Sequence, residues 1–141
     1  MERKASAIWN GGLKDGNGTI STESGALEAK QYSFSTRFEN GAGTNPEELI
    51  AAAHAGCFSM AFSNELGKAG MNPVSVATTA VATFEKTDAG FTITRIHLTT
   101  VAKVPGASKE AFDAAANAAK VGCPISRVLK AEITLDAKLE A

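Results

Sequence analysis

The sequence predicts an α+β fold in a single domain over residues 1–141, because blocks of strand-like and helix-like segments follow one another along the chain. Side chains alternate in the N-terminal third, and the long apolar stretch that comes next has helix signals at its start. Two more alternating segments, a second helical stretch and a closing strand give the order strands, helix, hairpin, helix, strand. A chain of this length can bury a core without disulfide or metal staples.

The N-terminal third has the pattern of a β-meander. Strands are predicted at residues 5–9 and 19–22, with turn residues between them. A third strand is predicted over residues 32–38, because apolar and polar side chains alternate there: Tyr32, Phe34, Thr36 and Phe38 on one face, and Ser33, Ser35 and Arg37 on the other. Arg37 would then lie on the polar face of a strand.

The most apolar part of the chain is predicted to form a long helix over residues 46–68. Asn45 fits its N-cap, Pro46 its first position, and Glu48 its first turn. Apolar side chains occur on most sides of this helix, which is typical of a buried, central helix. At about 1.5 Å per residue the helix would be about 33 Å long.

The C-terminal half alternates between strands and helices. Two strands joined by a turn are predicted over residues 74–103. The apolar positions of the second strand change parity between Ile93 and Ile96, which predicts either a bulge or burial of both faces there. Ser108 fits the cap of an alanine-rich helix, and Cys123–Pro124 has the pattern of a further helix start. Residues 133–139 alternate as a closing strand with one solvated face.

Composition argues against several classes of function. The 14 basic and 15 acidic residues are interspersed and give a net charge of −1, so no basic face for nucleic acid is expected. The apolar stretch over residues 49–62 is too short to span a bilayer, and no secretory signal is seen, so we expect a cytoplasmic protein without a membrane partner. The cysteine and histidine spacings match no compact zinc pattern, so we expect neither metal nor cofactor.

Two cysteines in such a chain are either inert thiols or a redox pair. Cys57 lies midway along the predicted long helix, where a small core residue is the ordinary interpretation and activation would need a cation from elsewhere. Cys123 lies at a predicted helix start, where unpaired backbone N–H groups favour a thiolate. Their wide separation in the chain excludes a local CxxC site.

Glu47 begins the long helix and lies ten residues before Cys57, which corresponds to about 15 Å along the helix. Direct contact between the two side chains of one helix is therefore excluded. If both residues serve one site, a second copy of the helix must supply one of them, and a shared function would imply a dimer. Taken alone, Glu47 fits helix capping, and Arg37 fits an ordinary solvated charge.

His54 precedes Cys57 by about one turn, so the two residues can share a helical face. A Cys–His pair is typical of nucleophilic acyl transfer, although a buried histidine is more often a hydrogen-bonded core residue. The residues by themselves leave three functions open. These are thiol redox chemistry, acyl transfer with His54, and a non-catalytic dimeric module that binds a small apolar ligand.

Three segments together resemble the OsmC/Ohr family of bacterial peroxidases: T-N-P-E-E-L at 44–49, A-A-H-A-G-C-F at 52–58 and G-C-P at 122–124. The order of elements is similar over essentially the whole chain. Further segments are more similar to the osmotically inducible branch than to the organic-hydroperoxide-resistance branch: residues 21–25, 88–91 and 128–133.

The resemblance implies an intertwined homodimer in which two long central helices are wrapped by antiparallel β-sheets from both chains. The family's peroxidatic cysteine matches Cys57, and its resolving cysteine matches Cys123. Its arginine and glutamate match Arg37 and Glu47, and these approach the cysteine from the partner chain. The implied site is therefore shared between two copies.

The implied activity is a thiol-dependent peroxidase for organic hydroperoxides and, less well, hydrogen peroxide, in oxidative or osmotic stress defence. A Cys57 sulfenic acid would condense with Cys123 to a disulfide, and a dithiol reductant of the lipoyl type would restore both thiols. We also expect that apolar side chains near Cys57 line a pocket for an alkyl group: Phe38, Phe58, Met60 and Phe62.

Overall fold

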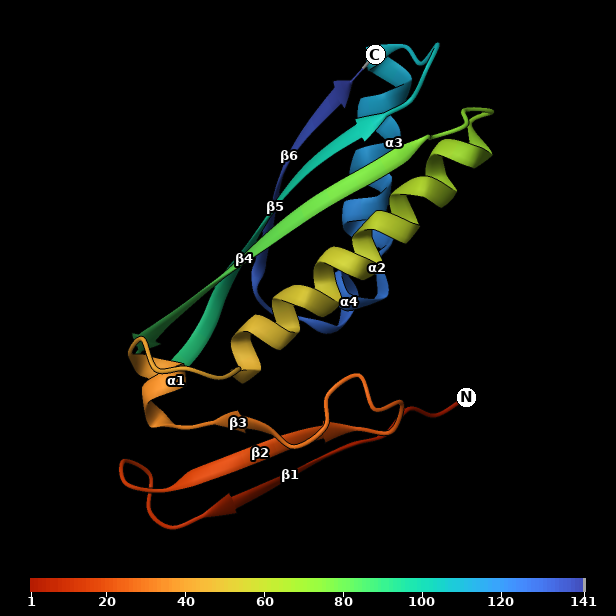
Figure 1. Cartoon of the computed structure of the whole chain (residues 1–141). Coiled ribbons are helices and arrows are strands. Elements are labelled where there is room, and N and C mark those ends of the chain that lie inside the picture. The colour runs from red at the N-terminus through yellow and green to blue at the C-terminus, as the bar shows by residue number, and fades with distance from the viewer. Residues whose placement is uncertain (141) are drawn as a thin grey trace. The chain divides into compact units, whose positions relative to one another are not determined.

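The computed structural model of the protein describes residues 1–140 and shows two compact units, divided after Leu49. Each unit contains its own three-stranded sheet (Figure 1). The long helix α2, Pro46–Lys68, begins in the first unit and continues through much of the second.

The first unit is an antiparallel sheet followed by a short helix. Its strands are β1 (Ala5–Asn10), β2 (Asn17–Thr22) and β3 (Lys30–Tyr32), paired in chain order. The first two strands confirm the predicted start of a meander, with a turn after Asn10.

The prediction of a strand over residues 32–38 is wrong beyond Tyr32, because helix α1 occupies Phe34–Phe38. The Ser33 hydroxyl accepts from the Thr36 amide at 3.2 Å, and the Thr36 hydroxyl oxygen accepts from the Ser33 amide at 2.8 Å. These reciprocal bonds form a capping box, which starts a helix despite the alternating pattern. Arg37 therefore lies in the last turn of a helix and not on a strand face.

Helix α2 confirms the predicted long helix and its start. The Glu48 amide donates to the Asn45 side chain at 2.8 Å, and the Thr44 hydroxyl donates to the Glu48 carboxylate at 2.8 Å. One line along α2, at four-residue spacing, is fully buried: His54, Phe58, Phe62 and Leu66. Another line is exposed and consists of small or flexible residues: Ala52, Gly56 and Met60.

The sheet of the second unit is mixed. Strands β4 (Ser75–Thr87) and β5 (Gly90–Lys103) are antiparallel, and their register shifts after Thr83, which confirms the predicted bulge. Strand β6 (Glu132–Glu140) pairs with β5 in parallel, so the expectation of antiparallel sheets is wrong here. The reason is the crossover, in which helices α3 and α4 carry the chain back before β6 begins.

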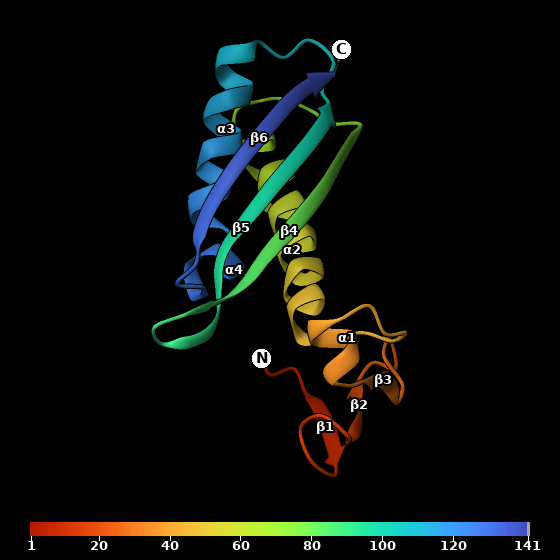
Figure 2. The same cartoon turned by 90° about the vertical axis from the view of Figure 1, so that its left-hand side faces the viewer.

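Helices α2 and α3 lie on the same face of this sheet (Figure 2). Helix α3 spans Lys109–Gly122 and is capped by the Ser108 hydroxyl, as predicted. Its Phe112 ring packs edge-on against Phe62 of α2, with ring centroids 5.2 Å apart. Apolar residues of β5 complete the core of the unit: Ile96, Leu98 and Ala102.

A chain of hydroxyl groups also joins α2 to the sheet. The Ser59 hydroxyl donates to the Thr78 hydroxyl at 2.8 Å, and Thr78 lies 3.0 Å from the hydroxyl of the fully buried Thr100. Thr100 in turn donates to the Ala77 carbonyl at 3.2 Å. These contacts satisfy hydroxyl groups that would otherwise be costly to bury.

Candidate functional site

Cys57 and Cys123 come together in the second unit. Cys57 lies midway along α2 and is partly exposed, whereas Cys123 is fully buried between the end of α3 and the start of α4 (Pro124–Val128). Both are free thiols, and a hydrogen bond with Cys123 is among the causes that raise the pKa of the Cys57 thiol. Folding therefore brings two cysteines that are distant in the chain close together.

The surroundings of Cys57 favour its protonated form within one chain. Burial is the largest cause, and it raises the pKa of the Cys57 thiol because a thiolate would lose solvation. The hydrogen bond with Cys123 raises the pKa further, while a hydrogen bond with the Ile125 backbone lowers it. Conversion of Cys57 into a nucleophile at neutral pH therefore needs a cation in addition to these groups.

A hollow with a volume of about 470 Å³ lies beside Cys57 on the surface of the second unit. It is bordered by α2 and by the α3–α4 junction, and Met60 is 78% exposed on its rim. Small side chains keep the hollow open: Ala61, Ala118, Ala119 and Gly122. Phe58 and Phe62, also predicted to line a pocket, are instead fully buried in the core.

Arg37 and Glu47 form an ion pair in the first unit. The Arg37 Nε donates to the Glu47 Oε1 at 2.7 Å, and the Glu47 side chain is only 10% exposed. Among residues 1–140 no hydrogen-bond partner is found for the buried Glu47 Oε2. The carboxylate thus holds one edge of the guanidinium, while the Arg37 side chain as a whole is 38% exposed.

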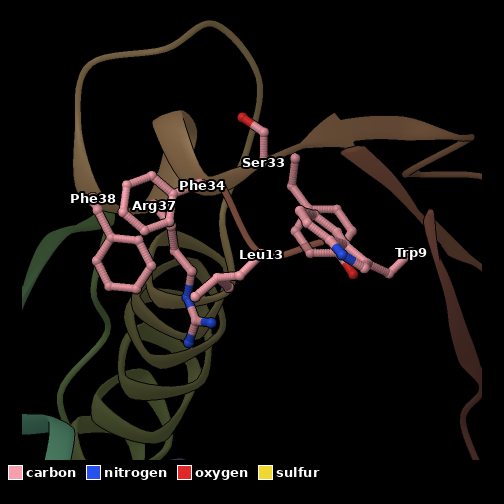
Figure 3. Close-up of a pocket in the computed structure, with 7 residues that line it drawn as sticks. Trp9, Leu13, Ser33, Phe34, Arg37 and Phe38 are labelled. Carbon is pink, nitrogen blue, oxygen red and sulfur yellow. The ribbon is translucent and has the colours of Figure 1, made fainter. Parts of the chain in front are cut away.

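Aromatic side chains surround Arg37 and border a second hollow of about 240 Å³ (Figure 3). The Arg37 guanidinium carbon lies 5.6 Å from the centre of the Phe38 ring, and the Phe34 and Phe38 rings are 4.7 Å apart. On the other side of the hollow, Trp9 packs against Tyr32 with ring centroids 5.3 Å apart (Figure 3). Of the predicted pocket residues, Phe38 is the one that lies here.

Sequence reasoning missed Trp9, Tyr32 and Phe34 as neighbours of Arg37. The predicted third strand put Arg37 on the face opposite to Tyr32 and Phe34, whereas α1 turns the chain so that all three line one hollow. The Ser33–Thr36 spacing is the signal that could have revealed this helix.

His54 is fully buried one turn before Cys57, and its ring contacts α4. His54 Nε2 lies 2.7 Å from the Ser126 hydroxyl, and burial lowers the pKa of the His54 imidazole. Nδ1 is buried without a hydrogen-bond partner in the described part of the chain. His54 is thus a neutral, hydrogen-bonded core residue, which disfavours its use as the base of a Cys–His acyl-transfer pair.

Within residues 1–140, no group of three or more potential ligand side chains is placed to hold a metal ion. Likewise, no helix in this range is both long and apolar enough to cross a membrane.

Comparison with known proteins places these features in context. Residues 39–138 match the family model described as OsmC-like protein. The chain is 55% identical to the peroxiredoxin OsmC of Escherichia coli (strain K12), over 100% of this chain and 99% of that protein. It is 29% identical to the organic hydroperoxide resistance protein OhrB of Bacillus subtilis (strain 168), over 87% of this chain and 88% of that protein.

Solved structures share the fold. An OsmC-like protein of unknown function from Vibrio cholerae matches with a TM-score of 0.77 at 20% identity, covering 97% of this chain and 99% of that one. An OsmC-like protein from Mycoplasma pneumoniae matches with a TM-score of 0.77 at 14% identity, covering 100% and 99%. Both matches extend over nearly the full length of the chain, so its mixed α+β architecture is that of these proteins.

Proposed function

Because this chain belongs to the OsmC-like protein family, we propose that it is a thiol-dependent peroxidase in which Cys57 reduces organic hydroperoxides and, less well, hydrogen peroxide. The observation that carries the proposal is the pair of neighbouring free thiols, Cys57 and Cys123, beside an open hollow. The relatives named peroxiredoxin and organic hydroperoxide resistance protein support the same chemistry. The cellular role that we propose is oxidative or osmotic stress defence in the cytoplasm.

The bonds that form and break in the proposed reaction belong to the two thiols, the hydroperoxide and a dithiol reductant. The Cys57 thiolate attacks the distal oxygen of the hydroperoxide, the O–O bond breaks, and an alcohol leaves after it takes up a proton. The resulting sulfenic acid condenses with the Cys123 thiol, which forms the disulfide and releases water. A dithiol reductant of the lipoyl type then supplies two electrons and two protons by thiol–disulfide exchange.

Arg37 is the cation that we assign to this site. An ordinary thiol with a pKa of about 8.5 is only about 3% ionised at pH 7, so full ionisation gains at most about 30-fold. Burial raises the pKa of Cys57 and makes a cation still more useful. The guanidinium would also bind the peroxide oxygens and stabilise the charge on the leaving oxygen, while Glu47 holds it in place.

Arg37 and Glu47 would act on Cys57 of a second copy of the chain. Glu47 and Cys57 lie ten residues apart on one helix, so about 15 Å separates them along its axis. A homodimer in which two α2 helices are central would bring the Arg37–Glu47 pair of one chain to the thiol pair of the other. The site would then be a property of the dimer.

The exposed line on α2 supports this dimer. Met60 is 78% exposed in a single chain, and a Cβ on Gly56 would meet no atom within 4 Å. A glycine inside a helix costs about 1 kcal/mol relative to alanine. No contact within residues 1–140 explains that cost, whereas close approach of a second α2 helix would.

The aromatic hollow at Arg37 indicates the kind of peroxide. Its walls are mostly apolar, and the Phe38 ring centre lies 5.6 Å from the guanidinium carbon of Arg37. A hydroperoxide with an apolar organic group would place that group against the rings and its peroxide oxygens against Arg37. We therefore propose organic hydroperoxides as the preferred substrates.

A thiol count tests the proposal. The reduced protein receives one equivalent of cumene hydroperoxide per chain, and its free thiols are counted before and after. The proposal predicts the loss of two thiols per chain, and Cys57→Ser removes peroxide consumption. Unchanged thiols in the wild-type protein would contradict it. Recovery with dihydrolipoamide but not with glutathione would identify the class of reductant.

A further inference from the structure

We propose that His54 and Ser126 form a clamp that positions Cys123 for the resolution step, so that the clamp decides whether the Cys57 sulfenic acid becomes a disulfide or a sulfinic acid. The inference rests on the proposed peroxidase function. It assigns His54 and Ser126 as positioning residues, because they act on the reacting sulfur atoms through α4.

The clamp joins the two helices that carry the reacting region. His54 lies three residues before Cys57 on α2, and its Nε2 is 2.7 Å from the Ser126 hydroxyl on α4. Ser126 follows Cys123 by three residues, and its neighbour Ile125 forms a backbone hydrogen bond with Cys57. The His54–Ser126 bond therefore joins α2 to α4 about one helical turn away from the two thiols.

Helix α4 has few other attachments. It is five residues long, none of its residues is fully buried, and its N-cap, Cys123, makes no capping bond with its side chain. Ile125 and Leu129 pack against the core while only partly buried. The part-buried hydrogen bond between His54 and Ser126 therefore contributes strongly to the position of this short helix.

The unpaired Nδ1 of His54 determines which residue is the donor in the His54–Ser126 hydrogen bond. If the Ser126 hydroxyl donated to Nε2, the neutral ring would carry its proton on Nδ1, where no acceptor is found among residues 1–140. An unpaired buried donor is costly. His54 therefore carries its proton on Nε2 and donates it to the Ser126 oxygen, and the ring leaves only a lone pair at Nδ1.

Two reactions compete for the sulfenic acid. Condensation with the Cys123 thiol forms the disulfide and releases water. A second hydroperoxide instead transfers an oxygen atom, which gives the sulfinic acid and an alcohol. Only the first reaction depends on the position of Cys123, so loosening α4 shifts the partition towards the sulfinic acid. One hydrogen bond of ordinary net strength corresponds to about a 2- to 12-fold change in the population of the positioned state.

Ser126→Ala tests the clamp, because it removes the acceptor at a half-buried site that tolerates a smaller residue. Reduced protein is mixed with one equivalent of cumene hydroperoxide, and samples are alkylated at intervals. Mass spectrometry then measures the protein mass, which distinguishes disulfide, free thiols and sulfinic acid. We expect disulfide formation to slow by about 5- to 10-fold, within the range set by one hydrogen bond. Sulfinic acid should accumulate under excess peroxide, and Ser126→Thr should restore the wild-type rate.

Ser59→Ala is the matched control. It also removes a hydroxyl that bonds α2 to another element, since Ser59 donates to Thr78 on β4, but it leaves α4 untouched. Wild-type resolution in Ser59→Ala, with slow resolution in Ser126→Ala, supports the clamp. Equal slowing in both variants would overturn it, as would resolution within twofold of wild type in Ser126→Ala or failure of the threonine rescue. If the protein is not a peroxidase, the wild-type protein loses no thiols when peroxide is added. That result differs from failure of the clamp alone, in which the wild type still forms the disulfide.

Discussion

Arg37 Nε donates to Glu47 Oε1 at 2.7 Å, although Arg37 ends one helix and Glu47 begins the next. The Glu47 side chain is nearly buried, whereas the Arg37 side chain is more than one third exposed. Water screens the Arg37 end of this pair, so the contribution of the pair to stability is modest. The main effect of the pair is to hold the Arg37 cation in place at the edge of an aromatic hollow.

Glu47→Gln should slow peroxide reduction by about 10-fold, because a charge-assisted hydrogen bond to Arg37 is replaced by a neutral one. The rate constant for Cys57 oxidation, measured by stopped flow, reports the effect. The melting temperature should change little. Glu48→Gln is the control, because Glu48 bonds to Thr44 and not to Arg37. A wild-type rate in Glu47→Gln would show that Arg37 needs no such support.

Arg37→Ala should cost more rate than the change in thiol pKa explains, so a loss of about 100-fold should remain when the rates are compared at equal thiolate fraction. The excess reflects lost orientation of the O–O bond and lost stabilisation of the leaving oxygen. The pKa of Cys57 is titrated by thiolate absorbance in both proteins, and rates are compared at equal thiolate fraction. Equal rates at equal thiolate fraction would contradict the account, and Arg37→Lys shows how much charge alone restores.

Stability should fall in mild acid because of His54. Its folded-state pKa is lowered by burial, so the unfolded chain binds a proton first as the pH falls. The contribution is complete above the unfolded pKa of about 6.5 and is lost as the pH falls towards the lower folded value. Urea unfolding from pH 7.5 to pH 5 measures this slope. His54→Gln should flatten it, while an unchanged slope would assign the loss to other groups.

Gly56→Leu should weaken the dimer. The site is exposed in one chain and an added Cβ would meet no atom within 4 Å, and the change replaces a poor helix former with a good one. Two α2 helices that approach closely at Gly56 could not accommodate the leucine. Analytical ultracentrifugation should therefore show dissociation at concentrations where the wild type is dimeric. Gly67→Leu, at an equally open site nearer the end of the helix, is the control, and intact dimers in Gly56→Leu would place the interface elsewhere.

The sequence predicted those features of the fold that depend on nearby residues in the chain, such as helix starts and a strand bulge. Helix α2 starts where Asn45 and Pro46 fit an N-cap and a first turn, and the change of parity near Ile93 marked the bulge in β5. Alternation alone misplaced the third strand, because a five-residue helix such as α1 can share that pattern.

Other features depend on long-range packing and could not be predicted from local patterns. The direction of β6 follows from the crossover through α3 and α4, and an alternating segment contains no information on direction. The contact of Cys57 with Cys123 and the bond of His54 to Ser126 both arise because α4 folds back against α2. The resemblance to a family supplied the cysteine pair in advance, whereas the partner of His54 emerged only from the structure.

In the proposed dimer, one site uses the thiols of one chain and the Arg37–Glu47 pair of another. Coexpression of differently tagged Cys57→Ser and Arg37→Ala chains, followed by purification of the mixed dimer, tests it most directly. A shared site predicts that each mixed dimer contains one intact site and regains about half of the wild-type peroxidase activity per dimer, although both parent dimers are nearly inactive. Activity of the mixed dimer no higher than that of its parents would show that Arg37 and Cys57 act within the same chain, and would contradict the account.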